Sequence, residues 1–199
     1  MNGEMEVKVM VHFLITLPVW TLIRWFGLAA YVSLFVGMAC GICYSFPQLK
    51  GAAKLRTMQA HTFANHLGTC LALLHALLLI IDTYMPFDWH ELLVPFTAAH
   101  SPGLNAIGTI AMYGLLLLVF TTDIRHKLKR KLWLTFHFLA YPIFALALFH
   151  GLFLGTDSTQ PLIKMMYGTT AAVLILLTAL RAAMRPRKSR VAVANTNQA

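Results

Sequence analysis

Residues 61–81 of the chain read HTFANHLGTCLALLHALLLII, a largely apolar stretch that contains no lysine, arginine or carboxylate. As a helix rising about 1.5 Å per residue, it is about 30 Å long, which matches the hydrocarbon core of a bilayer. With the two residues before it, the stretch therefore predicts a transmembrane helix over residues 59–81. It also contains His61, His66 and His75, and polar side chains inside a membrane span are costly enough to be functional candidates.

The rest of the chain has the composition of a membrane protein. Of its 199 residues, 58% are hydrophobic and 12% are charged, and the mean hydropathy is +0.67. Soluble domains usually have about twice that charged fraction. We therefore expect an all-α, polytopic transmembrane helix bundle, whose other four strong spans are 26–46, 105–121, 133–153 and 162–182.

The sequence divides into three predicted segments. Residues 1–25 are expected to form a short N-terminal hydrophobic or interfacial helix, because the stretch 9–23 is apolar but contains Pro18 and leaves almost no loop before the next span. A sixth span is the alternative for this stretch. The bundle is expected over residues 26–183, and residues 184–199 are expected to be a basic, disordered cytoplasmic tail near anionic lipid.

Charge separates the predicted loops into two sets. Residues 47–58, residues 122–132 and the tail hold most of the 16 lysines and arginines, whereas 82–104 and 154–161 hold carboxylates and no basic residue of either type. Cytoplasmic loops of membrane proteins have this basic excess. We therefore predict a multi-pass protein of the cytoplasmic membrane with a cytoplasmic C-terminus. The net charge of +9 then reflects topology and contact with membrane lipid, and no nucleic-acid partner is expected.

Four histidines occupy matched depths in two of the spans. His61 and His75 are 14 residues apart and His137 and His150 are 13 residues apart, so each spacing covers about 20 Å along a helix. Both helices run from the cytoplasmic to the outer side, so that His61 is level with His137 and His75 with His150. Two imidazoles that face each other suit iron, which imidazole binds well. The spacing predicts two bis-histidine iron sites.

The angular positions of these histidines are less uniform than their depths. At about 100° per residue, 14 residues return to within about 40° of the same helix face, but 13 residues end about 140° away. Pro142 lies between the histidines of the shorter spacing, and we expect it to kink the helix and change its winding. His66 is the rival of His61 as inner ligand, but it lies half a turn off the face of His75.

Further motifs surround these histidines. They are RWFGLAAY from Arg24 to Tyr31, His61 with His75, Trp133 followed by His137 and Tyr141, His150-Gly151 leading to Gly155-Thr156-Asp157, and LVPF from Leu93 to Phe96. Over about residues 20–180, the chain resembles the ferric reductase-like transmembrane domain. NADPH oxidases, ferric-chelate reductases and the haem-binding subunit of the bacterial periplasmic methionine sulfoxide reductase system share this domain.

The resemblance implies haem b as the cofactor, with two haems in the bundle. His61 and His137 would ligate the haem on the cytoplasmic side, and His75 and His150 the outer haem. Larger family members have a C-terminal FAD and NADPH domain, which we do not expect here because the chain ends at residue 199. FAD or FMN would then act only through a partner. The electron donor would be a separate flavoprotein or quinol, serving an external electron acceptor.

These features predict a ferric reductase-like oxidoreductase component, a di-haem membrane electron-transfer protein with no catalytic side chain of its own. One alternative is a single-haem subunit of a sulfoxide reductase-type system, and another is a non-redox membrane transporter or scaffold. The sequence contains no dinucleotide-binding GxGxxG motif, Walker A motif or HExxH zinc motif. The spans also contain almost none of the carboxylates that proton-coupled transporters use.

Overall fold

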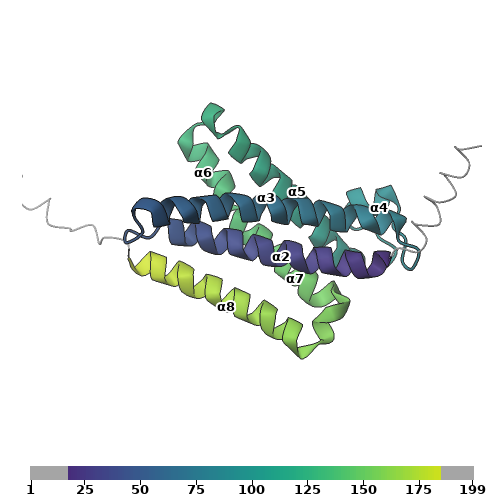
Figure 1. Cartoon of the computed structure of the whole chain (residues 1–199). Coiled ribbons are helices and arrows are strands. Elements are labelled where there is room, and N and C mark those ends of the chain that lie inside the picture. The colour runs from purple at the N-terminus through teal and green to yellow at the C-terminus, as the bar shows by residue number, and fades with distance from the viewer. Residues whose placement is uncertain (1–17, 185–199) are drawn as a thin grey trace, which may run out of the picture.

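The structure of the chain is a computed structural model that describes residues 18–184. Within this part every regular element is a helix, which confirms the predicted all-α class. Five stretches are long and apolar enough to cross a membrane, so the chain is a multi-pass membrane protein (Figure 1). The stretches are α2 (Val19–Tyr44), α3 (Gly51–Ile81), α5 (Pro102–Asp123), the consecutive α6 (Arg130–Phe138) and α7 (Ala140–Leu154), and α8 (Pro161–Ala183).

Short helices lie in the connections at the two ends of the bundle. α4 (Trp89–Leu93) and η2 (Thr156–Thr159) lie at the end where α2 starts, together with the carboxylates Asp88 and Asp157. We call this the acidic end. η1 (Arg125–Lys127) lies at the opposite end with the start of α3 and the last turn of α8, and we call this the basic end. The charge separation predicted from the loops is therefore present in the fold.

α2 is longer at its start than the span predicted from the sequence. It begins at Val19, so the boundary predicted between residues 25 and 26 falls inside a continuous helix. Pro18 directly precedes the helix, where its missing N–H removes no helical hydrogen bond. The rest of the predicted N-terminal segment and residues 185–199 of the predicted tail lie outside the described residues.

The span predicted over 133–153 consists of two helices with a break at Leu139. Pro142 has no N–H to donate, and its ring would collide with the carbonyl group four residues earlier, so a straight helix cannot continue through it. At the break, the Leu139 N–H donates to the Phe136 carbonyl at 2.9 Å, which makes a tighter turn than an α-helix. The expected kink between His137 and His150 is confirmed, and it precedes the proline.

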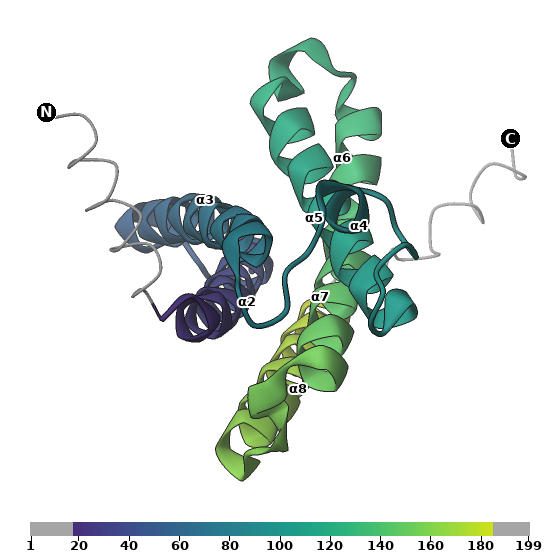
Figure 2. The same ribbon diagram turned by 90° about the vertical axis from the view of Figure 1, so that its right-hand side faces the viewer.

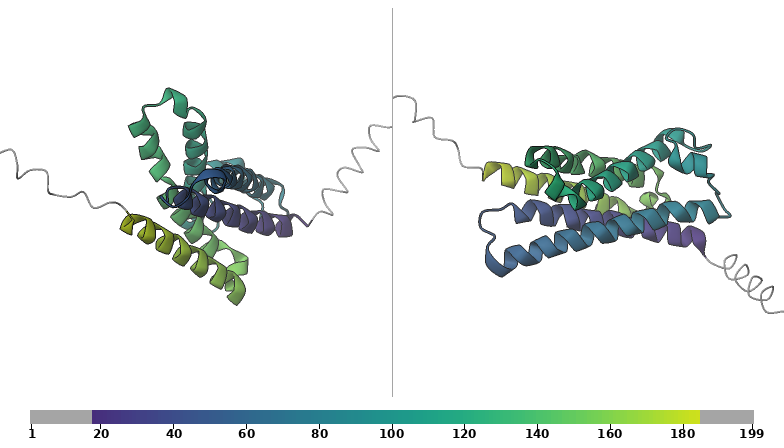
Figure 3. Two further views of the ribbon diagram at one scale, coloured as in Figure 1. Left: turned by 60° about the vertical axis from the view of Figure 1, so that its left-hand side comes forward. Right: turned by 90° about the horizontal axis from the view of Figure 1, so that it is seen from above.

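The helices form two groups. α2 and α3 lie side by side along much of their length, and α5 pairs with α7, as the end-on view shows (Figure 2). α8 contacts α2 and also α7, which joins the groups (Figure 3). α3 makes few close backbone contacts with α6 or α7, although these three helices contain the paired histidines. The histidine-bearing helices therefore lie apart instead of packing against each other.

A buried aromatic cluster joins α2, α7 and α8. Tyr31 stacks on Phe144 with ring centroids 5.2 Å apart and meets the edge of Tyr167 at 4.7 Å. The hydroxyl groups of Tyr31 and Thr170 share a hydrogen bond of 2.6 Å, so the buried Tyr31 hydroxyl has a partner. In sequence, Phe144 lies midway between His137 and His150, so the cluster fixes the helices at a depth between the two histidine levels.

Candidate functional site

The four predicted histidines form two pairs, one toward each end of the bundle. His75 of α3 and His150 of α7 have ring centroids 6.4 Å apart, and we call them the acidic-end pair. His61 of α3 and His137 of α6 have centroids 6.2 Å apart, and we call them the basic-end pair. The structure thus brings together the histidines that the matched depths pair in the sequence.

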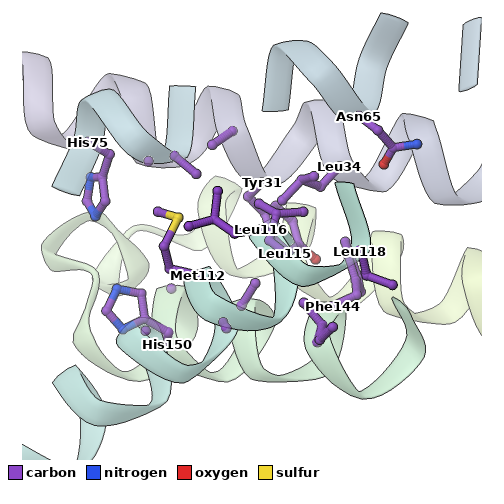
Figure 4. A pocket seen from close by; sticks show the side chains of 18 of the residues that line it. Tyr31, Leu34, Asn65, His75, Met112, Leu115, Leu116, Leu118, Phe144 and His150 are labelled. Atoms are coloured by element: carbon purple, nitrogen blue, oxygen red, sulfur yellow. The ribbon is translucent and has the colours of Figure 1, made fainter. Parts of the chain in front are cut away.

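Both pairs line one large cavity. In Figure 4, His75 and His150 point into the same space from opposite sides, with Met112 of α5 beside them. The cavity measures about 1840 Å³, and His61 and His137 line it as well. A pocket for one small molecule typically measures about 300–1,000 Å³. This cavity therefore has room for more than one ligand of that size.

Three of the four imidazoles donate a hydrogen bond from Nδ1 to a backbone carbonyl of a neighbouring helix. The bonds run from His75 to Ile23 at 2.8 Å, from His150 to Leu104 at 3.0 Å and from His61 to Gly37 at 2.7 Å. Because a carbonyl oxygen can only accept, each of these Nδ1 atoms bears the proton. In the neutral ring, Nε2 then keeps a free lone pair that can bind a metal.

A glycine lies beneath each of these three rings. The distances from a Cβ built on the glycine to the nearest ring atom are 3.0 Å for Gly27 and His75, 2.9 Å for Gly41 and His61, and 2.6 Å for Gly108 and His150. Real Cβ atoms essentially never come closer than 3.0 Å, and even 3.0 Å is an unusually tight contact. The three rings therefore rest on bare helix backbone, supplied by α2 in two cases and by α5 in the third.

Asn65, one turn after His61, adds a second contact at the basic end. Its Nδ2 donates to the His61 backbone carbonyl at 2.7 Å and lies 3.2 Å from His61 Nδ1. Two N–H groups cannot donate to each other, and the bond of 2.7 Å from Nδ1 to the Gly37 carbonyl is the shorter one. Asn65 therefore supports the backbone of α3, while the carbonyl sets the orientation of the imidazole.

His137 is held by stacking instead of by a hydrogen bond. Its ring stacks on Trp133, one turn earlier in α6, with centroids 5.1 Å apart and planes inclined by 22°. Within residues 18–184, the imidazole of His137 makes no hydrogen bond, in contrast to those of the other three paired histidines. Trp133 Nε1 is itself buried without a hydrogen-bond partner in that range. The neighbouring residues thus leave the tautomer of His137 unassigned.

Arg24 forms an ion pair with Asp157 at the acidic end. Arg24 Nε donates to Asp157 Oδ2 at 2.8 Å, and the guanidinium contacts the second carboxylate oxygen as well. This two-bonded geometry is the strong form of such a pair. It ties α2 to η2 directly after α7, beside the carbonyl that accepts from His75. The pair was not predicted from the sequence. The signal for it was the presence of opposite charges at the same end of two spans, Arg24 near the start of α2 and Asp157 just after α7.

The other described histidines are exposed and belong to neither pair. His66 lines the cavity, but the imidazole opposite His137 is that of His61. His90 lies in α4, while His100 and His126 lie in the connections at the two ends. Of the two alternatives for the basic-end position, the structure therefore places His61, not His66, across from the partner helix.

Glu91 of α4 fixes the loop beside the acidic end of the cavity. Its carboxylate accepts a hydrogen bond from the backbone N–H of Ala99 at 2.7 Å and another from that of Asp88 at 3.1 Å. These bonds, the one from Ala99 above all, hold the pKa of Glu91 below its usual value. The Tyr113 hydroxyl donates to the Leu93 carbonyl and thereby connects the same loop to α5.

The histidine pairs are limited to two side-chain ligands at each level. Among residues 18–184, no group of three or more histidine, cysteine and carboxylate side chains is arranged to hold a metal ion. A metal at either level would thus take its further ligands from water or from a bound cofactor. Comparisons with models of protein families, with curated proteins and with solved structures find no match to this chain.

Proposed function

We propose that the chain is a di-haem, b-type electron-transfer protein of the cytoplasmic membrane, of the ferric reductase-like kind. Its donor would be a flavoprotein or a membrane quinol, and its acceptor would lie on the outer side of the membrane. The observation that carries this proposal is the presence of two opposed histidine pairs in one large cavity of a membrane bundle.

The separation of the rings fits a metal ion held from both sides. An imidazole nitrogen binds a metal at about 2.0–2.1 Å and lies about 1.1 Å from its own ring centre, so two rings on opposite sides of one metal have centroids about 6.2–6.4 Å apart. The observed separations are 6.4 and 6.2 Å. Two imidazoles joined directly by a hydrogen bond would lie about 1 Å closer. The separations of both pairs therefore fit two rings that share a metal, and they are too long for a direct hydrogen bond between the rings.

The number of protein ligands favours haem over a bare ion. Haem brings most of the ligands of its iron with it, so the two histidines at each level would complete the coordination. The cavity volume of about 1840 Å³ is large enough for two cofactors, one at each level. When bound, each haem would supply a one-electron iron couple, while the protein supplies the ligands, their orientation and an apolar environment.

The protein's own residues orient the histidines of this site. The carbonyl partners of His61, His75 and His150 keep Nε2 unprotonated and make it a better ligand. The basic end, with η1 and the start of α3, would face the cytoplasm by the positive-inside rule. The basic-end pair would then lie on the donor side of the membrane and the acidic-end pair on the acceptor side.

Absorption spectra of the purified protein test this proposal. The full chain is produced in haem-replete cells, and spectra are recorded before and after reduction with dithionite. A Soret band and sharp α and β bands on reduction are expected, as six-coordinate b-type haem gives. The variant with His75→Ala and His150→Ala should lose about half of this absorbance, whereas the exposed His126→Ala should lose none. A colourless wild-type protein would overturn the proposal.

A further inference from the structure

We infer that Gly27, Gly41 and Gly108 are positioning residues for the ligand histidines, an inference that rests on the proposed function. Each glycine and the carbonyl group four residues before it form what we call a glycine seat. A seat receives one imidazole, accepts the hydrogen bond of its Nδ1–H and leaves Nε2 free to bind iron. The seats thereby decide which histidines of α3 and α7 become ligands and how strongly their Nε2 atoms bind iron.

The three seats share one geometry. In every case the glycine beneath the ring and the accepting carbonyl are one helical turn apart in the same helix. α2 supplies two seats to histidines of α3, and α5 supplies the third to a histidine of α7. The sets are Ile23, Gly27 and His75; Gly37, Gly41 and His61; and Leu104, Gly108 and His150. Three repeats of one arrangement, on two different helix pairs, point to a common purpose.

The missing side chain is what opens the carbonyl to the imidazole. In an α-helix, the carbonyl of one residue points toward the N–H of the residue four positions later. A side chain at that later position would cover the approach to the oxygen. A Cβ on the seat glycines would lie 2.6–3.0 Å from the imidazole, so even alanine would displace the ring, slightly at Gly27 and most strongly at Gly108.

Other glycines show that close helix contact alone does not make a seat. A Cβ on Gly114 would lie 2.6 Å from Ile143, and one on Gly68 would lie 2.8 Å from Leu34. Those glycines let helices approach closely, as small residues do in membrane proteins. They meet aliphatic side chains and accept no imidazole. The seats thus combine two features, a bare backbone and an imidazole bonded to the carbonyl one turn earlier.

The seats also predict a difference between the reduction potentials of the two haems. A hydrogen bond from Nδ1 to a carbonyl raises the basicity of Nε2, which favours the ferric state and lowers the reduction potential. The acidic-end pair has two seated ligands, whereas the basic-end pair has one, because His137 stacks on Trp133. A substitution that disturbs one seat should therefore change the reduction potential of one haem and leave that of the other unaltered.

Three alanine variants in α5 separate this role from helix packing. Gly108→Ala removes a seat, and Gly114→Ala makes an equally close contact with Ile143. Gly103→Ala adds a methyl group where nothing lies within 4 Å. Haem per chain and a redox titration with electron paramagnetic resonance, which distinguishes the two low-spin haems, are measured on the full chain. Gly108→Ala should lose about half of the haem, all of it from the acidic-end site, while the other two variants keep both haems.

Gly27→Ala provides a milder test that does not require Gly108→Ala to fold. Its Cβ would lie 3.0 Å from His75 Nδ1, so the ring has to shift by only a few tenths of an ångström and its bond to the Ile23 carbonyl lengthens. The acidic-end haem should remain bound with a higher potential, and Gly41→Ala should act on the basic-end haem instead. Unchanged potentials in both variants, or equal haem losses in Gly108→Ala and Gly114→Ala, would overturn the inference. A wild-type protein without haem would instead overturn the proposed function.

Discussion

The acidic-end pair and the basic-end pair hold their imidazoles at nearly the same separation, 6.4 and 6.2 Å between centroids, but by different means. At the acidic end, both rings donate to carbonyls and rest on glycines. At the basic end, His61 has this support, whereas His137 depends on its stacking with Trp133 and lies in α6, the short helix before the break. Equal spacing thus does not imply equal rigidity.

The difference teaches where the ligand geometry is already fixed by the fold. A side chain locked by hydrogen bonds loses little further freedom on binding, so preorganisation strengthens the bound state. We therefore expect the acidic-end site to bind its haem more tightly and to resist substitutions nearby. The basic-end site should be the first to lose its haem when the surrounding helices are disturbed.

The largest expected effect comes from removal of a ligand imidazole. His75→Ala or His150→Ala should abolish haem binding at the acidic end and leave the basic-end haem in place, which reduces haem per chain by half. His61→Ala and His137→Ala should do the reverse. Haem content and the redox signal of each site, measured on purified variants, check this pattern. The prediction fails if His66→Ala lowers the haem content while His61→Ala does not.

Pro142→Ala should have an intermediate effect of mixed sign. Replacing a proline that breaks a helix stabilises the helix by up to about 3 kcal/mol, so the melting temperature of the haem-free protein should rise. A continuous helix through residue 139 would turn His137 away from His61, so the basic-end haem should be lost in part. Melting curves and haem content are measured together, because a simple packing role for Pro142 would not move them in opposite directions.

Trp133→Leu should have a smaller effect, confined to the basic end. The stacking on His137 is worth about 0.5–1.5 kcal/mol, so its loss should weaken basic-end haem binding by about tenfold at most. Trp133→Phe keeps an aromatic ring and should bind nearly as well as the wild type. The exposed Trp25→Leu is the matched control. Haem release to apomyoglobin gives the two rates, and faster release from the acidic-end site would contradict the assignment.

Glu91→Gln should have the smallest effect, in the loop at the acidic end. The pKa of Glu91 in the folded state is lowered from its ordinary value of 4.5. The charged carboxylate therefore stabilises the loop fully above pH 4.5. This stabilisation is lost as the pH falls through the lower folded-state pKa. In the wild type, the protection factor of the Ala99 amide against hydrogen exchange should fall as the pH is lowered over that range. In Glu91→Gln it should be low at every pH.

The depth of each histidine in the bundle can be predicted well from the sequence, because the rise of an α-helix per residue is regular. The levels of His61 with His137 and of His75 with His150 follow from counting residues along two parallel spans, and the structure places these rings opposite each other. The kink before Pro142 also follows from local chemistry. The start of α2 at Val19 did not follow, because the apolar stretches on either side of residue 25 differ little in composition.

Contacts between helices could not be predicted in the same way. The pairing of Gly27 with His75 and of Arg24 with Asp157 depends on the relative height and rotation of separate helices, which no local pattern encodes. Gly103 and Gly108 lie five residues apart in α5, yet His150 rests on Gly108 and nothing lies within 4 Å of a Cβ built on Gly103. Sequence therefore identifies the four histidines as candidate ligands, whereas their supports emerge only from the packed fold.

The number of haems bound per chain tests the central claim most directly. The 199-residue chain is purified from haem-replete cells, its haem is quantified as the pyridine haemochrome, and its concentration is determined by amino-acid analysis. We expect two haems b per chain, falling to one in His75→Ala and to one in His137→Ala. A wild-type chain that binds no haem, or that keeps all its haem in both variants, would contradict it.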